Sequence, residues 1–60
     1  MRNYRVTHIR ITPTDSGATV TREILAKADF IARSATVALA EARALWLPME
    51  NVEYLTVVRT

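Results

Sequence analysis

Basic side chains crowd the start of the chain, where Arg2, Arg5, His8 and Arg10 fall within ten residues. Arginine donates hydrogen bonds in a fork that matches phosphate, and histidine adds a further donor, so these residues form a candidate anion-binding set. They also alternate loosely with apolar residues, which is typical of the solvent-facing side of a β-strand. We interpret the stretch first as the polar side of a strand. If it binds a partner, an acidic protein surface and nucleic acid are equal candidates.

The sequence contains no recognisable set of catalytic residues. Nucleophilic catalysis by serine or cysteine needs a positioned base, usually histidine, and the chain has one histidine and no cysteine. The acidic residues follow no recognised pair spacing, and Gly17, the single glycine, cannot form a glycine-rich phosphate loop. We therefore predict that the protein is not an enzyme and has no catalytic residues, no cofactor and no metal site.

A second candidate surface falls on a predicted helix. Val37, Ala40 and Ala44 lie on the side of that helix that should be polar. Small apolar residues let another backbone come close, although alanine is also the best helix former and needs no further reason. Trp46 is expected to cap the core, with an interface anchor as the alternative. The candidate partner-binding residues are thus Arg2, Arg5, His8, Arg10, Val37, Ala40, Ala44 and Trp46.

Three strands must position these residues. Residues 3–12 are rich in Val, Ile, Thr and Tyr and predict a strand, whose apolar residues share one face only if a β-bulge lies near Thr7 and His8. Pro13 and Gly17 predict a hairpin loop, after which residues 18–25 predict the returning strand. Alternation over residues 51–59 predicts the last strand.

One helix is predicted over residues 29–46, with Asp29 as its N-cap and Pro48 as its stop. Its inner stripe is mostly alanine and fits close approach to a flat sheet. The stripe consists of Ile31, Ala35, Ala38, Ala42 and Leu45. A rival interpretation begins the helix near Thr21 and extends the stripe over three heptads, but an alanine seam buries too little area for a stable coiled coil.

This order of elements predicts a single α+β domain of ββαβ type over residues 1–60. A hairpin followed by a right-handed crossover gives a three-stranded antiparallel sheet in the order 2-1-3, with one long helix packed on one face. The other face is left bare. A 60-residue chain without cysteine builds a small core, so we expect a homodimer or another partner to complete it.

Composition limits the class of partner. Half of the residues are apolar and the net charge is +2, which permits nucleic-acid binding without requiring it. The N-terminus lacks the apolar segment of a secretory signal, and no run reaches the ~18 apolar residues of a membrane span. We therefore expect a cytoplasmic protein that has no membrane partner.

The predicted function is a small protein-binding module that occupies the surface of another protein, either a second copy or a host protein. Size, composition and the lack of a catalytic set associate the chain with small proteins of phages and mobile elements, such as the anti-CRISPR proteins that inhibit host proteins sterically. The alternative is a nucleic-acid-binding domain that uses the basic N-terminal strand.

Overall fold

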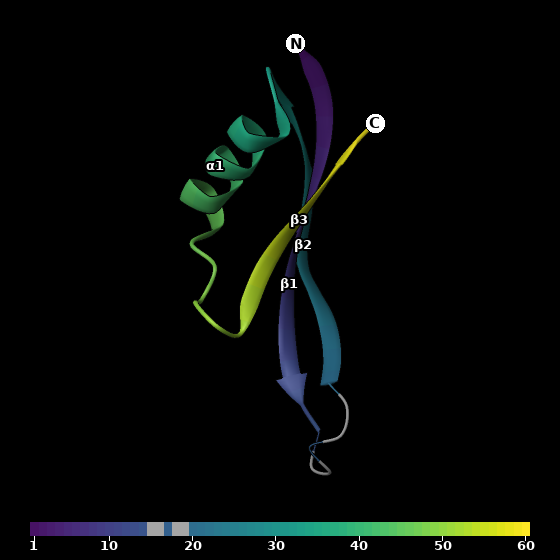
Figure 1. The fold of residues 1–60 in the computed structure, drawn as a ribbon, viewed down its shortest axis with the longest axis vertical. Coiled ribbons are helices and arrows are strands. Elements are labelled where there is room, and N and C mark those ends of the chain that lie inside the picture. The colour runs from purple at the N-terminus through teal and green to yellow at the C-terminus, as the bar shows by residue number, and fades with distance from the viewer. Residues whose placement is uncertain (15–16, 18–19) are drawn as a thin grey trace.

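A computed structural model describes residues 1–14, 17 and 20–60 of the chain, and in them three strands and one helix (Figure 1). The elements follow the order β1 (Arg2–Pro13), β2 (Val20–Ala32), α1 (Ala35–Trp46) and β3 (Glu53–Arg59). β1 is central in a sheet of order β2-β1-β3, and both neighbours run antiparallel to it. The predicted α+β fold and strand order are confirmed. Residues 18 and 19, the start of the predicted second strand, lie outside the described residues.

The helix begins at Ala35, later than predicted. Ser34 has an extended backbone and is the N-cap, because its hydroxyl accepts a hydrogen bond from the Val37 N–H at 3.3 Å. The prediction that Asp29 caps the helix is wrong, since residues 29–32 belong to β2. A start near Thr21 is wrong for the same reason, because Thr21 pairs with β1 in the sheet.

β2 continues through residues 26–32 because its side chains alternate between two environments. Residues that face each other across an antiparallel pair share a face, and the partners of the helix-side residues of β1 include Ala26, Ala28, Phe30 and Ala32. The ladder with β1 therefore overrides the helix propensity of this alanine-rich segment. The small side chains also leave room for the helix to approach.

An irregularity in the sheet falls on β2 rather than on β1. His8 pairs with Ala26 and Ile9 pairs with Ile24, so Leu25 is the extra residue. β1 keeps an unbroken register with β3. The condition for a single apolar face, a bulge in β1 near Thr7 and His8, is therefore not met. As a result, β1 carries apolar residues on both of its faces.

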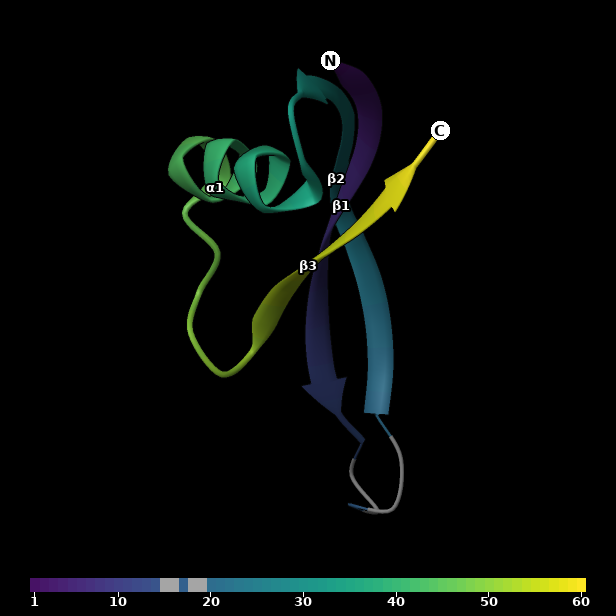
Figure 2. The same ribbon diagram turned by 45° about the horizontal axis from the view of Figure 1, so that its top comes forward.

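The core lies between α1 and one face of the sheet, as Figures 1 and 2 show from two directions. Its buried apolar residues are Tyr4, Val6, Ala32, Ala38 and Ala42. Because three of these are alanines, the helix lies close to the sheet, yet little apolar area is buried. The inner stripe was predicted only in part, since Leu45 is 65% exposed and Ile31 lies on the opposite sheet face, 66% exposed.

The β1–β2 hairpin projects beyond the rest of the molecule (Figure 2). β3 pairs with β1 only between Tyr4 and Arg10, whereas the β1–β2 ladder continues to Pro13 and Val20. The molecule is elongated, with extents of 45 × 20 × 15 Å. We call residues 9–13 and 20–24 the hairpin arm.

Candidate functional site

The basic residues of β1 do not form one surface. Arg2, His8 and Arg10 lie on the side of the sheet that faces α1, whereas Arg5 lies on the opposite side. The Arg5 Nε donates a hydrogen bond to Asp29 Oδ1 at 3.0 Å, so its charge is already paired. The structure thus divides the candidate anion-binding set over two faces.

His8 is buried beneath the helix instead of facing solvent, with an exposed fraction of 7%. Its Nε2 lies 2.7 Å from Glu53 Oε1. The same carboxylate accepts the Met49 N–H at 3.0 Å and, through Oε2, a hydrogen bond from Arg10 at 3.4 Å. These contacts tie the loop between α1 and β3 to the centre of the sheet.

The pKa of Glu53 is lowered from its ordinary value. The largest cause is the Met49 backbone N–H, which donates to the carboxylate, and His8 adds to it, while desolvation opposes both. Within the described residues, no three His, Asp or Glu side chains come together in a way that could hold a metal ion. The described contacts give the His8–Glu53 pair a structural role.

Trp46 completes this cluster from the end of α1. Its ring stacks on His8 with centroids 5.8 Å apart and an interplanar angle of 12°. It also meets Phe30 edge to face at 5.8 Å. Trp46 is half-buried against the core, which agrees with the interpretation as a core cap rather than an exposed anchor.

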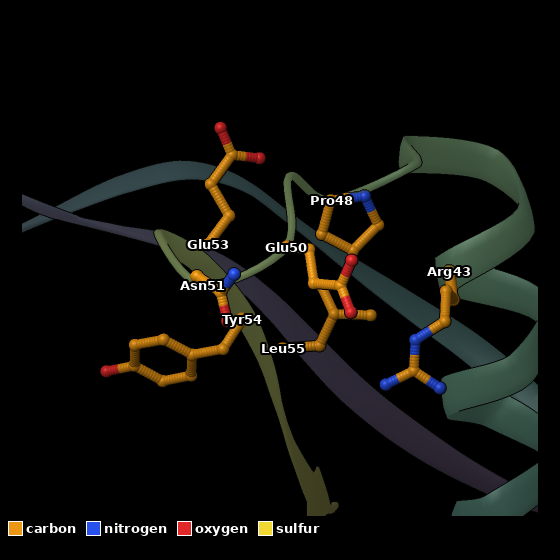
Figure 3. A pocket seen from close by; sticks show the side chains of 7 residues that line it. All are labelled: Arg43, Pro48, Glu50, Asn51, Glu53, Tyr54 and Leu55. Atoms are coloured by element: carbon orange, nitrogen blue, oxygen red, sulfur yellow. The ribbon is translucent and has the colours of Figure 1, made fainter.

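A shallow pocket of about 460 Å³ lies where the loop after α1 returns to the sheet (Figure 3). It is lined by Arg43, Pro48, Glu50, Asn51, Glu53, Tyr54 and Leu55. In Figure 3, Arg43 reaches from α1 toward the loop, whereas the Tyr54 ring points away from Arg43. Small-molecule sites use several polar groups that converge on one point, whereas here Tyr54 points away and Glu53 is held by His8 and Met49. The pocket is therefore a weak candidate for a ligand site.

The sheet face opposite α1 carries a band of apolar side chains. Ile9 lies between Ile24 on β2 and Tyr54 on β3, and Ile24 is 60% exposed. We call this side of the sheet the open sheet face. Its apolar members on the strands include Ile9, Ile11, Val20, Ile24, Ile31, Tyr54 and Val58.

A second apolar surface covers the outer side of α1 and its C-terminal end. Its apolar members are Val37, Ala40, Ala44, Leu45, Leu47 and Met49, with the exposed Glu41 among them, and we call it the helix surface. The first three are exposed, as the sequence predicted. The last three were not among the predicted site residues, and their exposed fractions are 65%, 78% and 61%. The available signal was the run LWLPM, which holds more large apolar residues than one side of a helix end can bury.

Leu47 combines exposure with an unusual backbone. It is the C-cap of α1 with φ 49° and ψ 60°, and its N–H donates to the Arg43 carbonyl at 2.9 Å. This left-handed position is usually taken by glycine, because a bulky side chain is strained there. The backbone of Leu47 therefore ends the helix, while its side chain stays exposed.

No protein-family model, no curated protein and no solved structure matches this chain. In the part that the structure describes, α1 has 12 residues, and no helix has the length and hydropathy needed to span a membrane.

Proposed function

We propose that this chain is a non-enzymatic protein-binding module that acts by occupying another protein with its helix surface. The observation that carries the proposal is the end of α1, where Leu45, Leu47 and Met49 are each more than half exposed. Covering apolar surface contributes about 25 cal/mol per Å², so three large side chains supply a strong driving force for association. One of them, Leu47, is at a left-handed backbone position.

The rest of the helix surface suits close contact with a partner. Val37, Ala40 and Ala44 follow one another at spacings of three and four along α1 and so share a side. Their small side chains permit a partner to approach the helix, while the large residues at its end act as anchors. The expected partner is a protein with an apolar groove that accepts one side of a helix.

Steric occupation needs no catalytic group, which fits a chain whose one histidine is held by Glu53 and Trp46. Among protein-binding modules of this kind, the chain could be an inhibitor of a host protein that is encoded by a phage or another mobile element. The features that support it are small size and a helix surface whose apolar residues the chain leaves exposed.

The nucleic-acid alternative has weaker support. Arg5 and Arg10 lie on opposite sides of the sheet and are already paired with Asp29 and Glu53. Phosphate would have to compete with both carboxylates, and His8 is buried beneath the helix. The experiment below therefore includes nuclease treatment, which separates nucleic-acid binding from protein binding.

The test is capture from a cell extract with the wild-type chain as bait, with and without nuclease. Ala44→Glu places a charge on the helix surface, and Thr21→Glu is the matched control on the exposed, α1-facing side of the hairpin arm. We expect a protein that survives nuclease, binds wild type and Thr21→Glu, and is lost with folded Ala44→Glu. Capture that nuclease abolishes, that Ala44→Glu does not change, or that never occurs would contradict the proposal.

A further inference from the structure

We propose that the open sheet face is covered by a second copy of this chain, packed face to face, so that the two helix surfaces point away from each other. The inference goes beyond the proposed function, which requires the helix surface alone. It accounts for the apolar side of the sheet that α1 leaves uncovered.

The chain is too extended for a compact monomer. It exposes 4416 Å², whereas size scaling gives about 4,000 Å² for a compact monomer of its mass. Its radius of gyration is 12.9 Å, against about 10 Å for a compact domain of this length. The outer part of the hairpin arm, beyond the last β1–β3 pair at Arg10 and Glu53, projects past β3 and adds to this extension (Figure 1).

The hairpin arm has a polar side and an apolar side. On the side that faces α1, its residues are Arg10, Thr12, Thr21 and Glu23. On the open sheet face, Ile9 and Ile24 form a cross-strand pair with Ile11 as the next apolar residue along β1. Strands that alternate in this way normally pack their apolar side against another layer. The chain's own helix cannot be that layer, because it packs on the opposite face of the sheet.

The size of the open sheet face reaches the lower limit for a specific dimer interface. The strands have 12, 13 and 7 residues. At about 3.3 Å per residue and 4.8 Å between strands, they give a flat footprint of about 500 Å². Two copies would cover about 1,000 Å² or more, which is the size at which interfaces become specific.

The charges of this face limit such packing but do not prevent it. Arg5 on the central strand is paired with Asp29, so burial of this pair has a desolvation cost that the apolar contacts must exceed. Arg22 and Lys27 lie on β2, which is an edge strand, so their side chains reach the rim of the interface and stay hydrated.

A second copy is favoured over an unrelated protein because the core is too small to fold well without help. Three of its five buried apolar residues are alanines, and the chain has no cysteine for a disulfide. Chains of this size are usually stabilised by oligomerisation, a disulfide or a bound metal. A second copy is present wherever the chain is made. Packing of faces is favoured over pairing of edges, because the free edge of β2 carries the bulge at Leu25.

Sedimentation equilibrium of the wild type, Ile24→Glu and the matched control Thr21→Glu tests this dimer. Both variants place a carboxylate on β2 in the hairpin arm, but on opposite sides of the sheet. We expect wild type and Thr21→Glu to sediment at twice the monomer mass at low and high salt. Ile24→Glu removes one large apolar side chain per copy from the interface and should weaken dimerisation about 100-fold or more. A wild-type monomer at every concentration, or a dimer that a folded Ile24→Glu leaves unchanged, overturns the proposal.

Spin labels decide the mode of packing even if Ile24→Glu unfolds. The chain has no cysteine, so Thr56→Cys on the open sheet face and Thr36→Cys on α1 each accept one label. Sheets packed face to face lie about 10 Å apart, so labels at position 56 should be much closer than labels at position 36. A shorter distance at position 36 overturns the proposal. Neither failure affects the proposed function, which is tested by capture through the helix surface.

Discussion

At Leu47 the backbone takes a conformation that glycine adopts freely and leucine does not. Leu47→Gly should relieve this strain and stabilise the fold by about 1 kcal/mol. The same change removes an exposed anchor and should weaken partner capture. Urea denaturation and capture measure the two effects, and Asn51→Gly, at φ 71°, is the control that should leave capture unchanged. Loss of stability in Leu47→Gly would contradict the strain at this position, and unaltered capture would contradict a binding role for Leu47.

Glu53 links the stability of the fold to acid. Its pKa is lowered from 4.5 in the folded chain by the Met49 N–H and His8, so the unfolded chain binds more protons in that range. The stabilisation is present above about pH 4.5 and is lost as the pH falls through the lower, folded value.

Glu53→Gln should therefore flatten the acid limb of the stability curve, measured by urea denaturation between neutral pH and pH 3. Asp29 also has a lowered pKa, because of Arg5, so Asp29→Asn shows how much of the limb belongs to the other pair. Parallel curves for wild type and Glu53→Gln would contradict this role of the carboxylate.

The start of α1 is decided by Ser34, whose hydroxyl accepts the Val37 N–H. Ser34→Ala should cost about 1 kcal/mol of stability, because a helix N–H loses its partner. Asp29→Ala should cost less, since Asp29 pairs with Arg5 on the sheet and caps no helix N–H. Chemical denaturation of the two variants measures the difference. A larger loss in Asp29→Ala would mean that the helix begins earlier.

The order of the elements could be predicted because strong local signals mark it, such as the Pro13–Gly17 loop and the stop at Pro48. The end of β2 was missed because Ala26, Ala28 and other helix formers suit either structure. Their alternation with Lys27 and Asp29 was present in the sequence, but its meaning depends on the ladder with β1.

The candidate site was predicted unevenly for a similar reason. Exposure of Val37 and Ala44 follows from helix periodicity alone, and the structure agrees. Burial of His8 depends on Glu53, a partner far along the chain, which no local pattern encodes. The exposure of Leu45 depends on where the helix lies over the sheet, and this is also a property of the whole fold.

At the scale of the whole molecule, two apolar surfaces lie on opposite sides of a small core. If one copy covers the other at the open sheet face, folding and association are coupled. The midpoint of thermal unfolding of the wild type should then rise with protein concentration, whereas that of Ile24→Glu should not. Calorimetry over a range of concentrations measures this, and a constant midpoint for the wild type would mean that the monomer is stable by itself.

The most direct measurement of the central claim is the salt dependence of affinity between the chain and the protein captured through its helix surface. Binding through apolar side chains should weaken by less than about tenfold between 50 and 200 mM salt, because few counterions are released. A loss of about 1,000-fold or more over the same range would be the behaviour of a surface that binds several phosphates. That result would contradict protein binding by the helix surface and would favour nucleic-acid binding by the arginines of β1.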